Sequence, residues 1–303
     1  MKKKLNFIPI FVIIIAMIII GSIFDLQINK AIYDPNNVFG LTMAAVGEAP
    51  GYATIGLFGG GFFFLGLKKY EKVWQKVLLI GLGTASLIAA VYFQGKHVID
   101  ENAFNIESEV YAWPLIALPV GLLVGGLGFG AGFFLSKTSD NPQLLKMFIV
   151  MASVTVVAVG LTTLIKNIML RPRYRFIALG SDSDFLNWWQ DGKSFYESLN
   201  GSVNKEEFKS FPSGHATSTA LCIMSLTYLP MFKSKWLQSK KLQTILIYVG
   251  LAWTLLMCFA RMLIGAHYLT DVGFGFAIVM ILFFIADFIF YKKPDFKAEV
   301  AKA

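Results

Sequence analysis

The chain has 303 residues, of which 56% are hydrophobic and 15% are charged, and its formal net charge is +8. Nearly uncharged runs of about 18 to 22 residues, the length that crosses ~30 Å of hydrocarbon, exclude an ordinary soluble protein. The lysines lie in short clusters beside these runs, a pattern that indicates membrane orientation and argues against nucleic-acid binding.

The hydropathy pattern predicts an all-α fold, a polytopic transmembrane helix bundle with about eight spans. The spans are expected near residues 7–24, 51–67, 77–94, 114–136, 147–166, 214–231, 243–262 and 271–291. The first apolar run follows a basic tip but lacks a convincing cleavage site, so we interpret it as a retained helix. Residues 25–50 are too polar to span and too apolar for an ordinary loop, which predicts an interfacial or re-entrant segment.

The connections after the second, fourth, sixth and eighth spans are basic, as in LKKYEKVWQK and KSKWLQSKKL. The positive-inside rule therefore predicts cytoplasmic N- and C-termini in the cell (plasma) membrane, with alternate connections outside.

We divide the chain into N-terminal helices (1–140), a core (141–292) and a cytoplasmic tail (293–303). In the fourth span, two GxxxG spacings indicate close packing within the bundle rather than a dimer interface; they are formed by Gly121, Gly125, Gly128 and Gly132.

The fifth predicted span ends in KNIMLRPRYR, residues 166–175, which contains three of the four arginines in the chain. Arginine suits planar, multidentate contacts such as those with phosphate. Pro172 cannot continue the helix, so Lys166 belongs to the last helical turn and the arginines to the chain that leaves it. These cations can converge on one anion; an anchor for lipid headgroups is the alternative interpretation.

The sixth predicted span begins with FPSGH, residues 211–215. Pro212 and Ser213 are helix start signals, with Ser213 as the expected N-cap, and Gly214 permits a close approach of the backbone to a ligand. The free N–H groups of a helix N-terminus attract anions, and His215 would point at such an anion. The alternative is an interfacial histidine beside a capped helix that binds nothing.

The seventh span closes with ARMLIGAHYLTD, residues 260–271, which contains Arg261, His267 and Asp271. If helical, His267 and Asp271 share a face, so the carboxylate can orient the imidazole as a nucleophile or base. A structural His–Asp pair is the alternative. Because all three stretches fall on one predicted membrane face, together they indicate a phosphoryl-transfer site without evident metal ligands.

These three stretches resemble the three-part signature of the type 2 phosphatidic acid phosphatase family, which is related to vanadium haloperoxidases and bacterial acid phosphatases. The resemblance covers about the last half of the chain and implies a six-helix-type phosphatase core. It implies that His267 attacks phosphorus to form a phosphohistidine, that Asp271 orients it, and that His215 protonates the leaving oxygen and then activates water. It implies phosphate-binding roles for Lys166, Arg173, Ser213, Gly214 and Arg261. It also implies that the reaction uses no cofactor and no metal.

Two positions depart from the family pattern. Arg173 is followed by Tyr174 where the family usually has proline, so Arg171, which precedes Pro172, is an alternative phosphate ligand. Ala260 stands where the family usually has serine before the arginine, which removes a hydroxyl from the third motif. Neither departure removes a proposed proton carrier or the nucleophile.

The resemblance implies a metal-independent phosphatase, a phosphoric monoester or pyrophosphate hydrolase that acts on lipids of the outer leaflet. Family members act on phosphatidic acid, phosphatidylglycerophosphate or undecaprenyl diphosphate, and the sequence does not select among these lipids. A lipid phosphotransferase is one alternative function. A non-catalytic lipid-binding or transport protein of the same fold is another. The expected partners are the lipid substrate and membrane lipids, with no nucleic acid.

Overall fold

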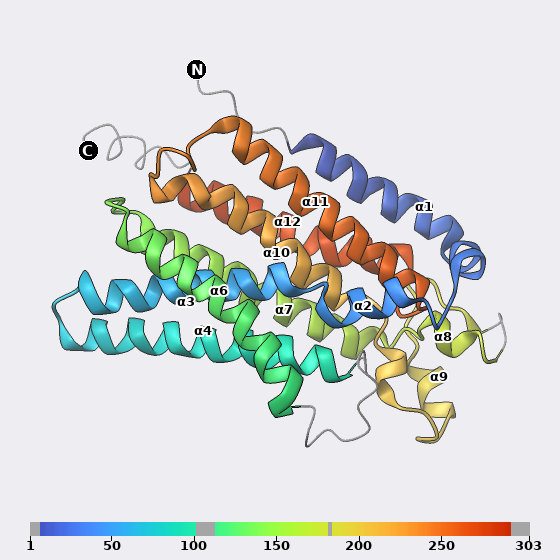
Figure 1. Cartoon of the computed structure of the whole chain (residues 1–303). Helices are drawn as coiled ribbons and strands as arrows, with labels where there is room; N and C mark the ends of the chain where they lie inside the picture. Colours follow the sequence, from blue (N-terminus) through green and yellow to red (C-terminus); the bar gives the residue numbers. More distant parts are fainter. Residues whose placement is uncertain (1–6, 101–112, 181–183, 292–303) are drawn as a thin grey trace.

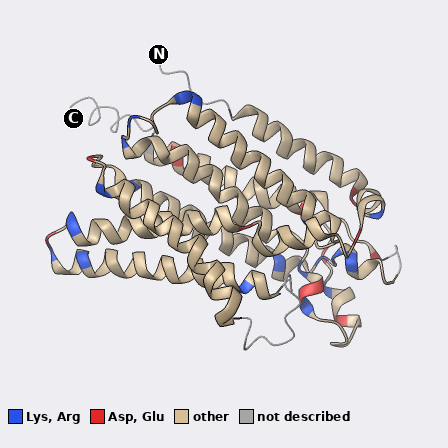
Figure 2. Cartoon of the chain, viewed as in Figure 1, with Lys and Arg blue, Asp and Glu red and all other residues tan. Residues whose placement is uncertain are grey.

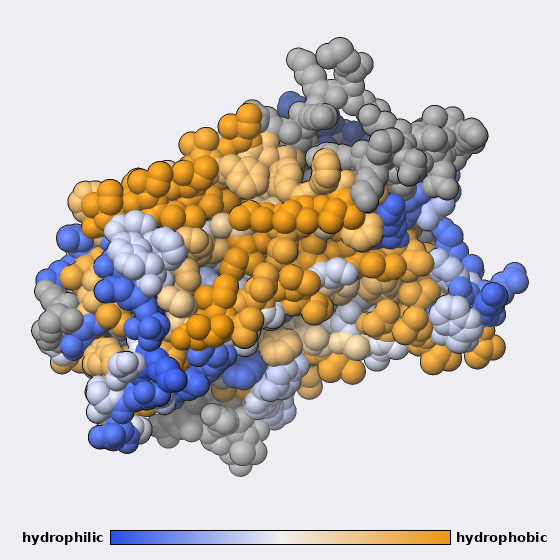
Figure 3. Space-filling model, turned by 180° about the vertical axis from the view of Figure 1, so that it is seen from behind, coloured by the Kyte–Doolittle hydropathy of each residue, from blue (hydrophilic) through white to orange (hydrophobic). Residues whose placement is uncertain are grey.

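The computed structural model describes residues 7–100, 113–180 and 184–291 (Figure 1). Within these ranges the chain forms helices and no strand, which confirms the predicted all-α class. The predicted tail 293–303 lies outside the described residues. Apolar side chains cover the middle of the bundle, and most charged residues gather toward its two ends (Figures 2 and 3).

The described part of the N-terminal half contains four long α-helices and one short one. They are α1 (Ile8–Ile32), α2 (Val38–Val46), α3 (Ala49–Lys68), α4 (Val73–Asp100) and α6 (Leu118–Lys137), which continues from the π-helical turn η1 (Trp113–Ala117). The prediction that the first helix stops near residue 24 is wrong, because residues 25–32 continue α1. Asp25 and Asn29 are 3% and 0% exposed, so their polar groups face the protein interior and do not end the helix.

The C-terminal half alternates long helices with short ones in its connections. Its elements are α7 (Leu144–Met169), α8 (Tyr174–Ile177), α9 (Lys193–Ser198), η3 (Lys205–Phe208), α10 (Gly214–Tyr228), η4 (Leu229–Phe232), α11 (Lys240–Leu263) and α12 (Leu269–Tyr291). The short elements α8, α9 and η3 all belong to the connection from α7 to α10 and lie together at one end of the bundle (Figure 1).

Seven helical segments of the described chain are long and apolar enough to cross a membrane. They support the predicted polytopic bundle and correspond to all the predicted spans except the sixth. That span forms α10, which has 15 residues and contains several Ser and Thr side chains. Most of α10 is buried against α3, α7, α11 and α12, so protein rather than lipid surrounds it and it needs less apolar surface.

One cluster of buried apolar side chains joins the two halves of the chain. It includes Ile10 of α1, Phe58 and Phe62 of α3, Phe148 of α7 and Phe283 of α12. The rings of Phe62 and Phe148 meet edge to face with their centroids 5.8 Å apart. The N-terminal helices therefore share a core with α7 and α12.

The glycines of α6 lie where this helix touches α3 and α4. A Cβ atom at Gly132 would lie 1.8 Å from Leu57 O, one at Gly128 2.2 Å from Ala53 O, and one at Gly121 2.3 Å from Val91 O. No side chain fits at these positions, so glycine lets the helix backbones touch. The prediction that the GxxxG spacings serve close packing within the bundle is confirmed.

Hydrogen bonds tie described connections together at both ends of the bundle. At one end, Asn141 Nδ2 donates to Met231 O at 2.6 Å, which ties the α6–α7 turn to η4. At the other end, Arg175 N donates to Gly265 O at 2.9 Å and Asp34 N to Leu263 O at 2.8 Å. These bonds join the α1–α2, α7–α10 and α11–α12 connections, which sequence analysis assigned to one side of the membrane.

Candidate active site

Lys166 lies in the last turn of α7, and the chain leaves the helix before Pro172, as the proline predicts. Leu170 adopts a left-handed conformation with φ 44° and ends the helix. The Lys166 ammonium donates to Lys209 O at 2.7 Å, which joins the end of α7 to the segment before α10. The first and second sequence motifs therefore meet through this lysine.

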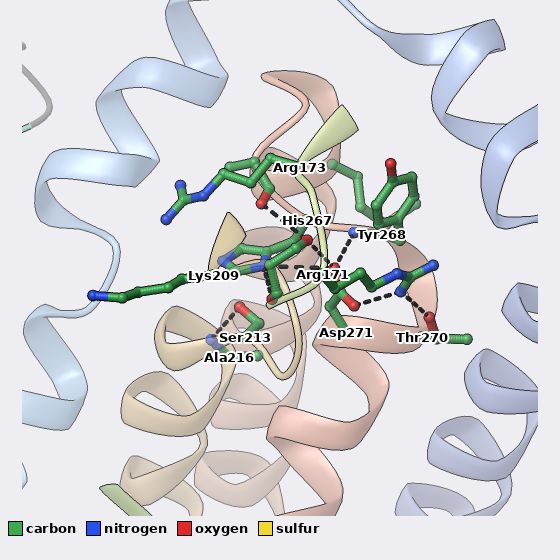
Figure 4. Close-up of polar contacts among 12 residues, drawn as sticks. Arg171, Arg173, Lys209, Ser213, Ala216, His267, Tyr268, Thr270 and Asp271 are labelled. Atoms are coloured by element: carbon green, nitrogen blue, oxygen red, sulfur yellow. Dashed lines mark hydrogen bonds and ion pairs between the residues drawn. The ribbon is translucent and has the colours of Figure 1, made fainter. Parts of the chain in front are cut away.

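Arg171 and Arg173 point in different directions (Figure 4). The Arg171 guanidinium is 1% exposed and donates to Asp271 Oδ1 at 2.6 Å, Asp25 Oδ2 at 3.0 Å and Leu186 O at 2.8 Å. These acceptors within the protein engage both terminal nitrogens of the guanidinium and its Nε. Arg173 instead donates from Nε to Glu206 O at 2.9 Å and lines a cavity. This geometry favours Arg173 over Arg171 as the candidate phosphate ligand.

The start of α10 has the cap that its sequence predicts. Ser213 Oγ accepts a hydrogen bond from Ala216 N at 3.3 Å, and Ser213 N donates to Asp271 O at 2.9 Å (Figure 4). The second bond ties the N-terminus of α10 to the first turn of α12. His215 follows in the first turn of α10, 9% exposed, and lines the same cavity as Arg173.

His267 lies between α11 and α12 and is 1% exposed. Its Nδ1 lies 2.7 Å from Ser210 O and 3.7 Å from Asp271 Oδ2. A carbonyl oxygen only accepts hydrogen bonds, so Nδ1 carries the proton and Nε2 keeps its lone pair. The closest contact of the ring is thus to the Ser210 backbone, whereas sequence analysis expected the Asp271 carboxylate in that place.

Asp271 acts on His267 partly through other groups. Its carboxylate accepts hydrogen bonds from Arg171, from Tyr268 N at 2.8 Å and from the Ser210 hydroxyl. Asp271 therefore fixes both Ser210, whose carbonyl receives the imidazole proton, and the residue that follows His267. Its negative charge also lies near enough to stabilise a positive charge on the ring.

The surroundings of His267 keep its imidazole neutral. Burial lowers the pKa of His267 well below its usual range, Asp271 raises it, and the nearby cations Lys166 and Arg173 lower it. A buried cationic imidazole loses hydration and is repelled by those cations, so the neutral form dominates near pH 7. His267 is consequently available as a nucleophile at ordinary pH.

Arg261 occupies the last turn of α11 and is 1% exposed. Its carbonyl oxygen accepts Ala266 N at 3.0 Å and His267 N at 3.3 Å, so this turn of backbone holds the histidine in place. Its positive charge acts on Lys166 and His215. The third motif thus supplies both backbone support and cationic charge.

A cavity of about 980 Å³ runs from this cluster into the bundle. Its polar end is lined by Lys166, Arg173, Gly214, His215 and His267. The rest is lined by mostly apolar side chains of α3, α4 and α7, such as Phe58, Phe62, Leu82, Ile149 and Val156. From Ile149 to Lys166 the cavity follows α7 for about 25 Å at 1.5 Å per residue.

Sequence analysis missed two polar residues of α1 that support the site. Asp25 Oδ1 accepts Thr270 N at 3.1 Å beside its ion pair with Arg171. Asn29 Nδ2 donates to His267 O at 3.1 Å. The signal was their spacing, because two polar residues four apart at the end of an apolar run lie on one helix face.

Sequence analysis also missed a buried pair beside His215. His97 Nε2 of α4 lies 2.9 Å from Glu48 Oε2 at the start of α3. Among the described residues, Glu48, His97 and His215 form the one group whose potential metal-ligand atoms lie within 4.8 Å of one another. A single acid between two apolar runs was the available signal for Glu48.

The bundle and the site define a polytopic membrane protein with a cationic, histidine-bearing cluster at one end of a mostly apolar cavity. The sequence model of the PAP2 superfamily matches residues 143–294, half of the chain, so the protein belongs to the PAP2 superfamily. This confirms the family resemblance and indicates a phosphatase or a related lipid phosphate enzyme. No curated protein and no solved structure matches the chain. The matched range includes every motif residue from Lys166 to Asp271 but excludes Asp25, Asn29, Glu48 and His97.

Proposed function

We propose that the protein is a metal-independent phosphatase that hydrolyses a lipid monophosphate or pyrophosphate through a phosphohistidine intermediate. The observation that carries the proposal is the shape and lining of the cavity, which joins a cationic, histidine-bearing end to a long apolar groove. A molecule that fits both parts has an anionic head and a hydrocarbon tail. Lipid phosphates have this composition, whereas soluble phosphate esters leave the groove unused.

The phosphoryl group is bound by positive charge that the protein itself supplies. Lys166 and Arg173 line the polar end of the cavity, and the charge of Arg261 lies near enough to act on Lys166. The N-terminus of α10 adds the Ser213 hydroxyl and the backbone N–H of Gly214 together with the positive end of the helix dipole. Such fixed donors stabilise the extra negative charge of a five-coordinate phosphorus without reorganisation.

In the first step, Nε2 of His267 attacks phosphorus, a P–N bond forms and the bond from phosphorus to the leaving oxygen breaks. His215 donates its proton to that oxygen, a contribution of about 10²–10⁴-fold for general acid catalysis. Nδ1 of His267 keeps its bond to Ser210 O, and Asp271 stabilises the cationic ring. In the second step, His215 takes a proton from water, the water oxygen attacks phosphorus, and the P–N bond breaks to restore neutral His267.

We further propose that this site faces the outside of the cell membrane, with both termini in the cytoplasm. The support comes from the basic residues in the connections at the opposite end of the bundle, such as Lys68, Lys137 and Lys233. Cytoplasmic connections carry an excess of such residues. The substrate would then be a lipid of the outer leaflet, with its tail in the groove.

The test is phosphate release by the purified protein from phosphatidic acid, phosphatidylglycerophosphate and undecaprenyl diphosphate, with and without a metal chelator. We expect release from at least one lipid, unchanged by the chelator, and abolished together with any acid-labile phosphoenzyme in His267→Ala. The matched control is Lys193→Ala, an exposed position in the connection from α7 to α10, and it should retain full activity.

Undiminished phosphate release by His267→Ala, or loss of phosphate release on addition of the chelator, would contradict the proposal. Dephosphorylated lipid without free phosphate would instead identify a phosphotransferase, and no turnover would favour a binding protein.

A further inference from the structure

The Glu48–His97 pair lies outside the family core yet beside its proposed acid. The ring of His97 lies between two others, stacked on Tyr52 at a centroid distance of 5.8 Å and edge to face with His215 at 5.0 Å. Tyr52 also donates from its hydroxyl to Glu48 Oε2 at 3.2 Å. Glu48, His97 and His215 all line the cavity, so the pair extends the polar end of the site.

Three contacts between helices fix this arrangement. A Cβ atom at Gly51 would lie 2.1 Å from Ser218 O, so the start of α3 touches the α10 backbone one turn after His215. Trp253 Nε1 of α11 donates to Gly47 O at 2.7 Å, and Gln94 Nε2 of α4 donates to Ala45 O at 3.1 Å. The turn before α3 is therefore held from both sides, which places Glu48 and His97 against α10.

Stability alone is a weak reason to keep such a pair in this position. A buried ion pair gains little over apolar packing, because its desolvation offsets its attraction. Ionisable residues within membrane helices mark functional sites by default. Here the pair also meets the one histidine that the proposed mechanism requires in its protonated form.

The charges around His215 explain what the pair supplies. The cationic or potentially cationic groups around His215 are Arg261, His97, His267 and Lys166. Two described carboxylates line the cavity, Glu48 and Glu206. Glu206 forms an ion pair with Lys209 and is 56% exposed, so Glu48, which is 2% exposed, is the carboxylate that counters this charge.

We propose that Glu48 and His97 are positioning residues for the acid–base histidine: Glu48 holds His97, the His97 ring orients His215, and the Glu48 carboxylate offsets the positive charge around His215 during attack on a lipid phosphate. This inference rests on the proposed function. His215 gives one proton to the leaving oxygen and regains one from water, so the pair supplies no net proton. Its effect is on the orientation of His215 and on the charge that surrounds it when the reaction starts.

The test uses two synthetic phosphate monoesters with the same apolar chain, one an alkyl ester and the other a nitrophenyl ester. The alkyl oxygen needs a proton in order to leave, whereas the nitrophenolate leaves without one. We expect Glu48→Gln and His97→Gln to lower kcat/KM for the alkyl ester by about 10- to 100-fold, within the range of general acid catalysis. For the nitrophenyl ester the change should stay within about twofold, because no acid is needed.

A pH profile and two further variants separate this role from a structural one. In Glu48→Gln, the alkaline limb of kcat/KM for the alkyl ester should move to lower pH, because less His215 stays protonated. Glu48→Asp should restore part of the activity on the alkyl ester. Gln94→Met removes an anchor of α4 one turn away without touching a titratable group, so any loss should be equal for both esters.

Equal losses on both esters in Glu48→Gln and His97→Gln would overturn the proposal, since they would mean that the pair only supports the fold. A wild-type leaving-group preference that changes with a chelator or with added Zn²⁺ would also overturn it, in favour of a metal held by Glu48, His97 and His215. These outcomes are distinct from a failure of the proposed function, which would appear as activity on both esters in His267→Ala.

Discussion

Arg171 and Arg173 have similar sequence contexts but different roles in the folded chain. Arg171 joins Asp25 of α1 to Asp271 of α12 and packs its guanidinium 4.1 Å from the centre of the Tyr268 ring. Arg173 reaches the cavity. The two arginines lie two residues apart on a non-helical segment. The side chain of Arg171 belongs to a buried ion-pair network, whereas that of Arg173 is a candidate ligand.

We predict that Arg171→Gln destabilises the protein, because it leaves two buried carboxylates without their cation. Breaking a buried pair costs about 3–5 kcal/mol. The measurement is thermal unfolding in detergent. The double variant Asp25→Asn/Arg171→Gln should recover part of this loss, since it also removes one of the unpaired charges.

Arg173→Ala is the variant to compare with Arg171→Gln. It should keep the melting temperature close to that of the wild type and lower kcat/KM for lipid phosphate, with partial recovery in Arg173→Lys. If Arg171→Gln instead unfolds like the wild type and raises KM, Arg171 is the phosphate ligand.

The grouping of the motif residues was predictable from sequence, because their types and spacings suit a single site for a phosphoryl group. Lys166, Arg173, His215 and His267 do line one cavity. The hydrogen-bond partner of His267 was not predictable, because a backbone carbonyl such as Ser210 O has no sequence signature. Glu48 was missed for a different reason: its partner His97 lies on another helix, and only packing brings the two together.

At the scale of helices, hydropathy found the spans but not all of their ends. The prediction stopped α1 at its first polar residues, although Asp25 and Asn29 face Arg171 and the His267 loop rather than lipid. A polar side chain ends an apolar run in sequence without ending a helix. Predicting the true end required knowledge of the buried partners of these two residues.

The glycines of α6 provide a prediction with an internal control. Gly132→Ala places a methyl group 1.8 Å from Leu57 O, so α3 and α6 must separate, at a cost of about 1–3 kcal/mol. Gly130→Ala adds the same atom where no other atom lies within 4 Å, and it should stabilise the helix by about 0.4–1 kcal/mol. Thermal unfolding of both variants in detergent tests the difference, and equal melting temperatures would argue against close α3–α6 packing.

At the scale of the whole molecule, the N-terminal helices complete a site whose motifs all lie in the C-terminal half. α3 and α4 line the apolar groove together with α7, and α1 supplies Asp25 and Asn29 next to the His267 loop. In the proposed function the sequence motifs therefore carry the phosphate chemistry, whereas the groove proposed for the lipid tail depends on helices for which the sequence offered only hydropathy.

If the groove holds the lipid tail, narrowing it should affect long substrates more than short ones. Ala152 lines the cavity on α7, about 14 residues or roughly 21 Å along the helix from Lys166. Ala152→Phe should raise KM for long-chain lipid phosphates by about tenfold, the effect of losing about 1.4 kcal/mol of apolar contact, and leave short-chain substrates unchanged. Val157→Phe adds bulk on the same helix at an exposed position outside the cavity lining, so it should change KM for neither long-chain nor short-chain substrates. Steady-state kinetics over a series of chain lengths tests this prediction. A KM that is independent of chain length in Ala152→Phe would show that the tail lies elsewhere.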